Sequence, residues 1–253
     1  MTNALPGRVL FIGATGGSGR LAVAAAVRHG LQVRAFARNP ERARKILPGV
    51  DIAKGDLEDP AALAAAVEDV EAIVFTHGSD SDGRSDSASR IDYGGVANTL
   101  HALNGRRPRI ALMTSINVTR RDNGAYQDLL DWKRRSERLV RLSGARYTII
   151  RPSWFNPGAG AQLVIEQGDT GSGAVSREQV AEVLIRSLLT DAAVGKTFEL
   201  YATAGGATTD WKGLFDTAIS DTAGALDGAK DPDNLPLEKE PAPVREDVVR
   251  VRA

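Results

Sequence analysis

Three glycines near the start of the chain have the spacing of a dinucleotide-binding turn. Residues 13–19 read GATGGSG and lie between the apolar run Val9–Ile12 and the alanine-rich segment Leu21–His29. In a turn from a strand into a helix, Gly13 permits the sharp bend, Gly16 lets the backbone approach a pyrophosphate, and Gly19 lets the helix pack tightly on the sheet. Glycines are common in turns, so an ordinary strand-to-helix turn is the alternative, but this context favours dinucleotide binding.

The end of the second apolar run indicates which dinucleotide is bound. A carboxylate about 20 residues beyond the glycines would bind the ribose hydroxyls of NAD, but residues 36–40 read FARNP and contain no Asp or Glu. Arg38 is placed to pair with a 2′-phosphate, and Arg42 follows one helical turn later. We therefore expect NADP, with NAD possible; a solvated loop arginine is the alternative for Arg38. Asp56 could accept a hydrogen bond from the adenine amino group or cap the next helix.

Other polar and aromatic side chains follow predicted strands, where ligands of such sheets bind. His77 follows the fourth strand and could bind the cofactor, donate a proton or orient a substrate, because histidine titrates near neutral pH; a structural histidine bonded to its loop is the alternative. Trp154, Phe155 and Tyr93 could form a pocket for a flat substrate, or belong to the core. The three histidines lack metal-ligand spacing, so we expect no metal.

Short apolar runs alternate with helical patterns through the first part of the chain. The predicted strands are Val9–Ile12, Gln32–Ala37, Val50–Lys54, Ala72–Thr76, Ile110–Thr114 and Tyr147–Ile150. The predicted helices are Arg20–His29, Pro40–Ile46, Pro60–Val67, Ser89–Leu103 and Tyr126–Ser143. This alternation predicts an α/β fold, a doubly wound parallel sheet of the Rossmann-like type with helices on both faces. A ligand would then bind at the carboxyl ends of the strands.

The second part of the chain is less regular. Gln179–Leu189 is predicted to be a helix, Phe198–Ala202 a strand and Ala207–Ser220 a further helix. The charged, proline-rich tail from Gly224 is either a packed extended arm or a partly disordered end. We expect one domain over residues 1–253, with a cofactor-binding core at 1–152 and a small C-terminal substrate-side region at 153–253. The polar loop Gly78–Ser89 should be mobile and become ordered on binding cofactor or substrate.

The motifs, taken in order, resemble those of a known group of proteins. The glycine turn is followed by GDL at residues 55–57, Thr114-Ser115, Lys133 and YTIIRP at residues 147–152. Over roughly residues 8–202 this set resembles the atypical short-chain dehydrogenase/reductase group. Within it, the chain is similar to the NAD(P)H-binding branch of NmrA-like proteins, biliverdin reductase B and flavin or quinone reductases. The residues then expected to contact the cofactor are Gly13, Thr15, Gly16, Gly17, Ser18, Gly19, Arg38, Asp56, Leu57, Thr76, His77, Gly78, Lys133 and Pro152.

The chain departs from this group at the position of the catalytic tyrosine. The main branch of the superfamily has a tyrosine four residues before its lysine, and here that residue is Leu129. The resemblance implies that Ser115 polarises a carbonyl and that Lys133 binds the nicotinamide ribose; a turn cap and a surface lysine are the alternatives. Tyr126 is a candidate substitute acid, on the same helix face as Lys133 but about two turns away.

These residues favour an NADP(H)-dependent oxidoreductase that transfers hydride to a small or flat organic acceptor, such as a flavin or a quinone. Such acceptors need little acid catalysis, because solvent can protonate the product. A non-catalytic redox sensor of the NmrA-like kind is one alternative, favoured by the missing tyrosine. A tailoring enzyme that acts as an epimerase, dehydratase or oxygenase on a polycyclic substrate is another.

Composition argues against several other classes of protein. The formal net charge is zero and no basic face is evident, so nucleic acid is not an expected partner. The chain has no cysteine, which excludes disulfides and thiolate chemistry. No apolar run approaches the roughly 18 residues of a membrane span, and Met1–Arg8 does not resemble a signal sequence. We expect a cytoplasmic monomer or homodimer with a small-molecule substrate, although the charged face at residues 133–138 argues against a dry dimer interface there.

Overall fold

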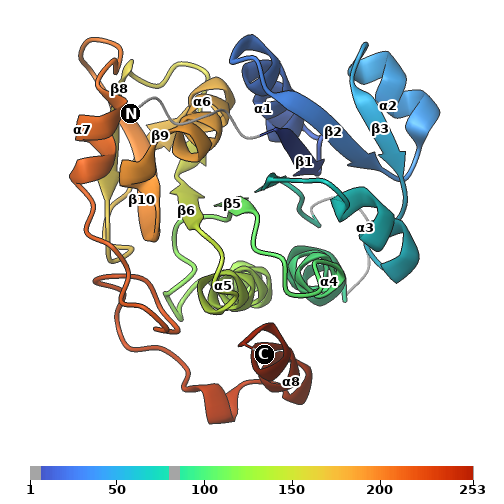
Figure 1. The fold of residues 1–253 in the computed structure, drawn as a ribbon. Helices are drawn as coiled ribbons and strands as arrows, with labels where there is room; N and C mark the ends of the chain where they lie inside the picture. The colour runs from blue at the N-terminus through green and yellow to red at the C-terminus, as the bar shows by residue number, and fades with distance from the viewer. Residues whose placement is uncertain (1–6, 80–85, 253) are drawn as a thin grey trace.

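The computed structural model describes residues 7–79 and 86–252, which form a mostly parallel sheet of ten strands (Figure 1). The strand order is β3-β2-β1-β4-β5-β6-β10-β9-β7, and β8 pairs with β10. The strands are β1 (Arg8–Ile12), β2 (Gln32–Ala37), β3 (Asp51–Lys54), β4 (Ala72–Phe75), β5 (Arg109–Met113), β6 (Tyr147–Pro152), β7 (Trp154–Phe155), β8 (Gln162–Glu166), β9 (Ala174–Val175) and β10 (Lys196–Thr203). The direction of the strand order reverses between β1 and β4, the position where doubly wound sheets bind ligands.

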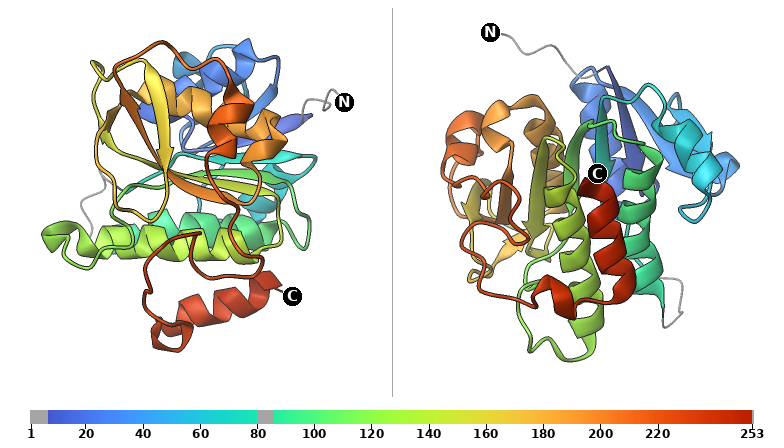
Figure 2. Two further views of the ribbon diagram at one scale, coloured as in Figure 1. Left: turned by 90° about the vertical axis from the view of Figure 1, so that its left-hand side faces the viewer. Right: turned by 60° about the horizontal axis from the view of Figure 1, so that its bottom comes forward.

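Helices cover both faces of the sheet, so the doubly wound prediction is confirmed (Figures 1 and 2). The α-helices are α1 (Gly17–Arg28), α2 (Pro40–Ile46), α3 (Pro60–Val67), α4 (Gly94–Ala102), α5 (Gln127–Leu142), α6 (Arg177–Leu189), α7 (Trp211–Asp216) and α8 (Ala242–Arg252). One apolar core lies between the sheet and α1 with α6, and the other lies between the sheet and α3, α4 and α5. Apolar residues from alternate positions of the central strands supply both cores, as expected for strands that are buried on both faces.

Several predicted boundaries differ from the observed ones. Helix α1 begins at Gly17 rather than Arg20, so the last glycines of the turn lie within its first turn. The predicted helix at Ser89–Leu103 begins as a π-helical turn, η1 (Ala88–Tyr93), before α4. The predicted helix Ala207–Ser220 is only Trp211–Asp216, because the Asp210 side chain caps it and accepts from the amide of Gly213. Residues 80–85 of the loop predicted to be mobile lie outside the described residues.

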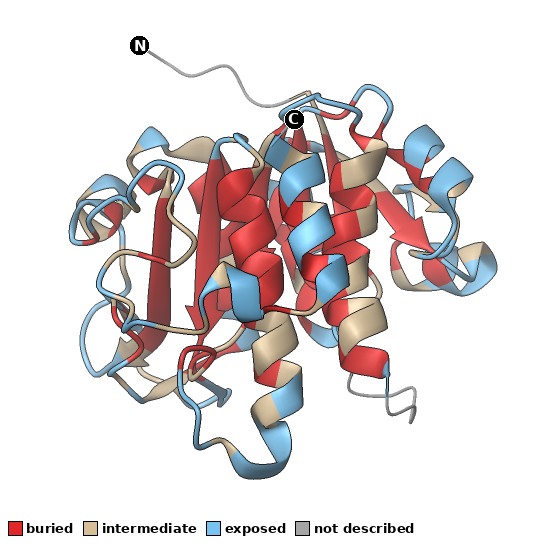
Figure 3. Ribbon diagram, turned by 90° about the horizontal axis from the view of Figure 1, so that it is seen from below, coloured by how far each residue is buried: buried red, intermediate tan, exposed pale blue. Residues whose placement is uncertain are grey.

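The tail from Gly224 is a packed arm that ends in α8, not a disordered end. The arm crosses α5, and α8 lies against α4 and α5 on the side away from the sheet (Figure 1). Figure 3 shows this layer from outside, with exposed residues along α8 and buried ones along the helices behind it. The charged face of α5, expected to be hydrated, is therefore covered by the chain's own C-terminal residues.

The covered face of α5 is neutralised by carboxylates of the arm. Glu240 is buried and accepts hydrogen bonds from Arg134 at 2.8 Å, Arg135 at 2.7 Å and Arg138 at 2.7 Å. Arg138 also binds both carboxylate oxygens of Asp227, at 2.9 and 2.8 Å. Since an isolated buried guanidinium is costly, these bonds are required for the arm to close over α5.

This arrangement predicts that Glu240→Gln strongly destabilises the protein. The substitution leaves the buried arginines facing a neutral amide, so the free energy of unfolding should fall by about 3–5 kcal/mol, the usual cost of breaking a buried ion pair. Urea denaturation measures it. Glu246→Gln, at an exposed position of α8, is the matched control and should change stability by less than about 0.5 kcal/mol. Equal effects of the two substitutions would contradict this account of α5.

Candidate functional site

A cleft of about 370 Å³ lies at the carboxyl ends of β1, β2 and β4, beside the point where the strand order reverses. It is lined by five separate parts of the chain, four of them around loops that follow strands and the fifth in η1. The predicted cofactor residues among its lining are Gly13, Thr15, Gly16, Arg38, Asp56, Leu57, Thr76, His77 and Gly78. The topology of the sheet brings these residues together although they span more than 60 positions of sequence (78 − 13 = 65).

The turn between β1 and α1 has no room for side chains at two of its glycines. Gly13 has a φ of +87°, and a Cβ there would lie 2.5 Å from the amide nitrogen of His77. A Cβ on Gly19 would lie 2.0 Å from the carbonyl oxygen of Gly13. Helix α1 is thus held directly against the turn. The described residues supply no acceptor for the amides of Gly17, Ser18 and Gly19, and the first turn of α1 has no acidic residue. Free amides at a helix N-terminus favour an anion such as a diphosphate.

The end of β2 presents arginines to the cleft. Both Arg38 and Arg42 line it, and no carboxylate of the described residues forms an ion pair with either. The Asn39 side chain caps α2 by accepting a hydrogen bond from the amide of Arg42 at 2.9 Å. This bond fixes the turn from β2 into α2. The alternative prediction that Asp56 caps the next helix is wrong, because Asp59 is the residue that caps α3. The Asp56 carboxylate instead accepts from the amide of Glu58 at 3.0 Å.

His77 lies in the wall of the cleft with its ring nitrogens buried. Neither nitrogen has a hydrogen-bond partner among the described residues, so the alternative of a loop-bonded histidine is not supported. A Cβ on Gly95 would lie 2.6 Å from His77 Nε2. The ring therefore fits only because residue 95 is a glycine. Burial lowers the pKa of His77 to about 4. The imidazole is therefore neutral near pH 7, and a cationic proton donor is not available there.

Lys133 reaches the same wall but is already paired. Its ammonium group donates to Asp92, a buried residue of η1, and the other oxygen of Asp92 accepts from the amide of Ser79 at 3.2 Å. The Nζ atom lies 3.8 Å from the position of a Cβ on Gly78. Lys133 is thus not a surface lysine: it lies behind the loop after β4, outside the lining of the cleft, and it ties α5 to that loop. No sequence motif indicates Asp92, because the two partners are 41 residues apart.

The other predicted site residues occupy different places. Ser115 is half-buried directly after β5, and Tyr126 is 65% exposed at the end of a short 3-10 helix, outside the lining of the cleft. Trp154 and Phe155 are 66% and 39% exposed at the edge of the sheet, so they are not core residues. Tyr93 does not belong to a substrate pocket. It is buried beneath α8, where its hydroxyl donates to Asp247 at 2.7 Å.

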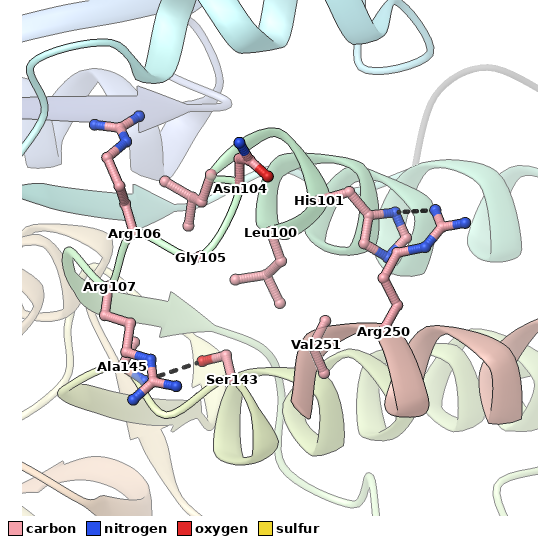
Figure 4. Close-up of a pocket in the computed structure, with 11 residues that line it drawn as sticks. Leu100, His101, Asn104, Gly105, Arg106, Arg107, Ser143, Ala145, Arg250 and Val251 are labelled. Carbon is pink, nitrogen blue, oxygen red and sulfur yellow. Dashed lines mark hydrogen bonds between the residues drawn. The ribbon is translucent and has the colours of Figure 1, made fainter. Parts of the chain in front are cut away.

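A second hollow, of about 420 Å³, lies at the opposite edge of the sheet (Figure 4). It is formed by the ends of α4 and α5 and by α8, with Arg106, Arg107 and Arg250 around it. Two of its basic groups have structural partners. Arg106 donates to the carbonyl of Val67 at 2.6 Å, and His101 lies 3.2 Å from a carboxylate oxygen of Asp247. This hollow is remote from the glycine turn, so the cleft at the strand reversal is the better candidate for the functional site.

Residues 7–79 and 86–252 contain no group of three or more His, Asp or Glu side chains that could hold a metal ion. No helix within these ranges is both long and apolar enough to cross a membrane.

The fold and the cleft define an NAD(P)-binding protein of the Rossmann-like class. The sequence profile of the NAD(P)H-binding family matches residues 13–191, so the chain belongs to this family of atypical short-chain dehydrogenases/reductases. A chloroplastic protein of Arabidopsis thaliana is 30% identical over 233 residues, covering 84% of this chain and 83% of that one. Sanguinarine reductase of Eschscholzia californica is 26% identical over 260 residues, covering 82% and 94%.

Solved structures show the same fold. An oxidoreductase from Lactococcus lactis superposes with a TM-score of 0.70 at 20% identity, covering 83% of this chain and 95% of that one. At this identity the likeness establishes the architecture alone. The roles of residues such as Arg38 must therefore be interpreted from the cleft of this chain itself.

The buried imidazole of His77 gives a prediction for the pH dependence of stability. Histidine in the unfolded chain titrates near 6.5 and in the folded protein near 4, so the unfolded state takes up the proton first as pH falls. Stability should decrease as pH falls from 6.5 towards 4. Between pH 7 and pH 5 the free energy of unfolding of the wild type should fall by up to about 2 kcal/mol more than that of His77→Asn, as measured by urea denaturation. Parallel losses in both proteins would show that His77 is accessible to protons in the folded state.

Proposed function

We propose that this protein is an NADPH-dependent oxidoreductase that transfers hydride to a flat organic acceptor such as a flavin or a quinone. The observation that carries the choice of cofactor is the end of β2, where Arg38 and Arg42 face the cleft and no carboxylate of the described chain is paired with them. A guanidinium at this position favours a 2′-phosphate, whereas NAD would require an acceptor for its ribose hydroxyls.

The residues present fit a dinucleotide. Gly13 and Gly19 let the turn and α1 pack directly against each other and against the end of β4, and the amides of α1 supply donors for a diphosphate. When bound, the nicotinamide supplies the hydride. The protein supplies orientation: the turn holds the diphosphate, Arg38 holds the 2′-phosphate, and His77 lines the cleft beside the loop that Lys133 supports.

The lack of an acidic donor supports a flat acceptor. Leu129 replaces the tyrosine of the main branch, His77 is neutral, and Lys133 is paired with Asp92. A simple ketone would need a donor for its developing alkoxide, whereas a reduced flavin or quinone can take its proton from water. The exposed rings of Trp154 and Phe155 offer apolar surface for such a molecule. The similarity to sanguinarine reductase supports a reductase without identifying the acceptor.

The choice of cofactor is tested by Arg38→Ala. Loss of a charge-assisted pair to the 2′-phosphate should weaken NADPH binding roughly 10- to 100-fold and leave NADH binding unchanged, because only NADPH carries that phosphate. Fluorescence titration measures both affinities. Arg44→Ala removes the same charge from an exposed position of α2 outside the cleft and should change neither. Equal weakening of NADPH and NADH by Arg38→Ala would refute the NADPH assignment.

Turnover is tested by following NADPH oxidation with flavin and quinone acceptors. We expect turnover in the wild type and a kcat for Tyr126→Phe within about twofold of it, since the Tyr126 hydroxyl is exposed and lies outside the lining of the cleft. A fall of about 100-fold would instead identify Tyr126 as the acid. Tight NADPH binding without turnover on any acceptor would favour the non-catalytic sensor.

A further inference from the structure

The N-termini of α1 and α6 lie beside each other, and one arginine joins them. Arg177 is the first residue of α6, and Ser176 caps this helix in a reciprocal pair of bonds with Gln179. A Cβ built on Gly17, the first residue of α1, would lie 3.4 Å from Nε and 3.6 Å from Cδ of Arg177. The Arg177 side chain therefore extends from α6 across to the beginning of α1.

An aromatic ring holds this side chain in place. The Arg177 guanidinium lies 4.1 Å from the centre of the Phe155 ring, a distance at which a cation is attracted to the face of the ring. Phe155 belongs to β7, which pairs with β9 in the register Phe155 opposite Val175. Because Val175 directly precedes the cap of α6, the same strand pair positions both the ring and the arginine. Phe155 therefore acts here as a support for a cation as well as an exposed apolar surface.

The charge of Arg177 has no counter-charge among residues 7–79 and 86–252. No carboxylate there pairs with it, and its guanidinium is exposed. A cation at the first position of a helix also opposes the helix dipole, which favours negative charge at that end. Helix α1 adds a second positive end at the same place, with the amides of Gly17, Ser18 and Gly19 free. Two helix N-termini and an unpaired guanidinium thus meet here; the first turn of α1 has no acidic residue, and that of α6 has Glu178, next to Arg177 in the sequence.

We propose that Arg177 is a further cofactor-binding residue, and that its guanidinium pairs with the diphosphate of the dinucleotide at the N-terminus of α1. This inference rests on the proposed function. It gives the cleft two separate anion-binding arginines: Arg38 for the 2′-phosphate at one end and Arg177 for the diphosphate at the glycine turn.

The test measures the affinities of three ligands that separate the two phosphate sites: NADPH, ADP-ribose and 2′-AMP. ADP-ribose contains the diphosphate without the 2′-phosphate, and 2′-AMP contains the 2′-phosphate without the diphosphate. Arg177→Ala should weaken the binding of NADPH and of ADP-ribose about tenfold and leave the binding of 2′-AMP unchanged. Arg38→Ala should weaken NADPH and 2′-AMP and leave ADP-ribose unchanged. Phe155→Leu, which removes the support of the guanidinium, should have a smaller effect than Arg177→Ala on the same two ligands.

Two control variants make the result specific. Arg245→Ala removes one positive charge from an exposed position of α8, remote from the cleft, and should leave all three affinities unchanged. Arg177→Lys keeps the charge and should recover part of the lost affinity for ADP-ribose. Urea denaturation of each variant checks that the fold is retained, which is expected because Arg177 is exposed.

The outcomes distinguish this inference from the proposed function. If the wild type binds none of the three ligands, the proposed function itself fails. If the wild type binds NADPH, and Arg177→Ala binds both NADPH and ADP-ribose as tightly as the wild type does, the role of Arg177 is refuted while the proposed function stands. If Arg177→Ala weakens the binding of 2′-AMP as much as that of ADP-ribose, the substitution acts through the overall charge of the cleft. The assignment of Arg177 to the diphosphate is then overturned.

Discussion

The buried guanidinium of Arg151 constrains more of this structure than any single apolar contact described above. Arg151 is about 1% exposed and binds Glu137 at 3.0 and 2.7 Å, Asp231 at 2.7 and 2.7 Å, and Glu199 at 3.0 Å. These partners come from α5, the C-terminal arm and β10. Thr114, at the end of β5, donates to Glu137 at 2.7 Å. Because charges buried this deeply must remain paired, the elements that carry them have little freedom to move apart.

This network extends to the loop that carries Ser115. Glu199 accepts from the amide of Asp169 at 2.9 Å, and the Asp169 carboxylate accepts from the amides of Asn117 at 2.6 Å and Thr119 at 2.9 Å. Asn117 and Asp169 both have left-handed backbone conformations, with φ of 68° and 53°, which Asn and Asp tolerate better than most residues. Burial raises the pKa of Glu199 to about 7. The loop after β5 is therefore fixed by polar contacts with the buried network behind it.

The sequence allowed the cofactor half of the protein to be predicted because its signals are local. The glycine turn lies within a few residues, and Asn39 with Pro40 and Asp59 with Pro60 mark helix starts that the structure contains. The contacts that position the other residues of the candidate site join distant positions of the chain: Asp92 with Lys133, and Arg177 with Phe155. No periodicity reveals such contacts. The two-residue strands β7 and β9 are likewise too short to produce an alternating pattern.

The pairing of α5 with Glu240 has a consequence for synthesis of the chain. Glu240 lies 106 positions after Arg134, and a ribosome makes the chain from its N-terminus. When α5 has left the ribosome, the carboxylate that neutralises its arginines has not yet been incorporated, so those guanidinium groups must remain hydrated. The sheet and α1 can assemble earlier, but the layer of α5 and α8 can close only after translation has passed residue 240. Folding of this layer during translation thus waits for the arm that carries Glu240.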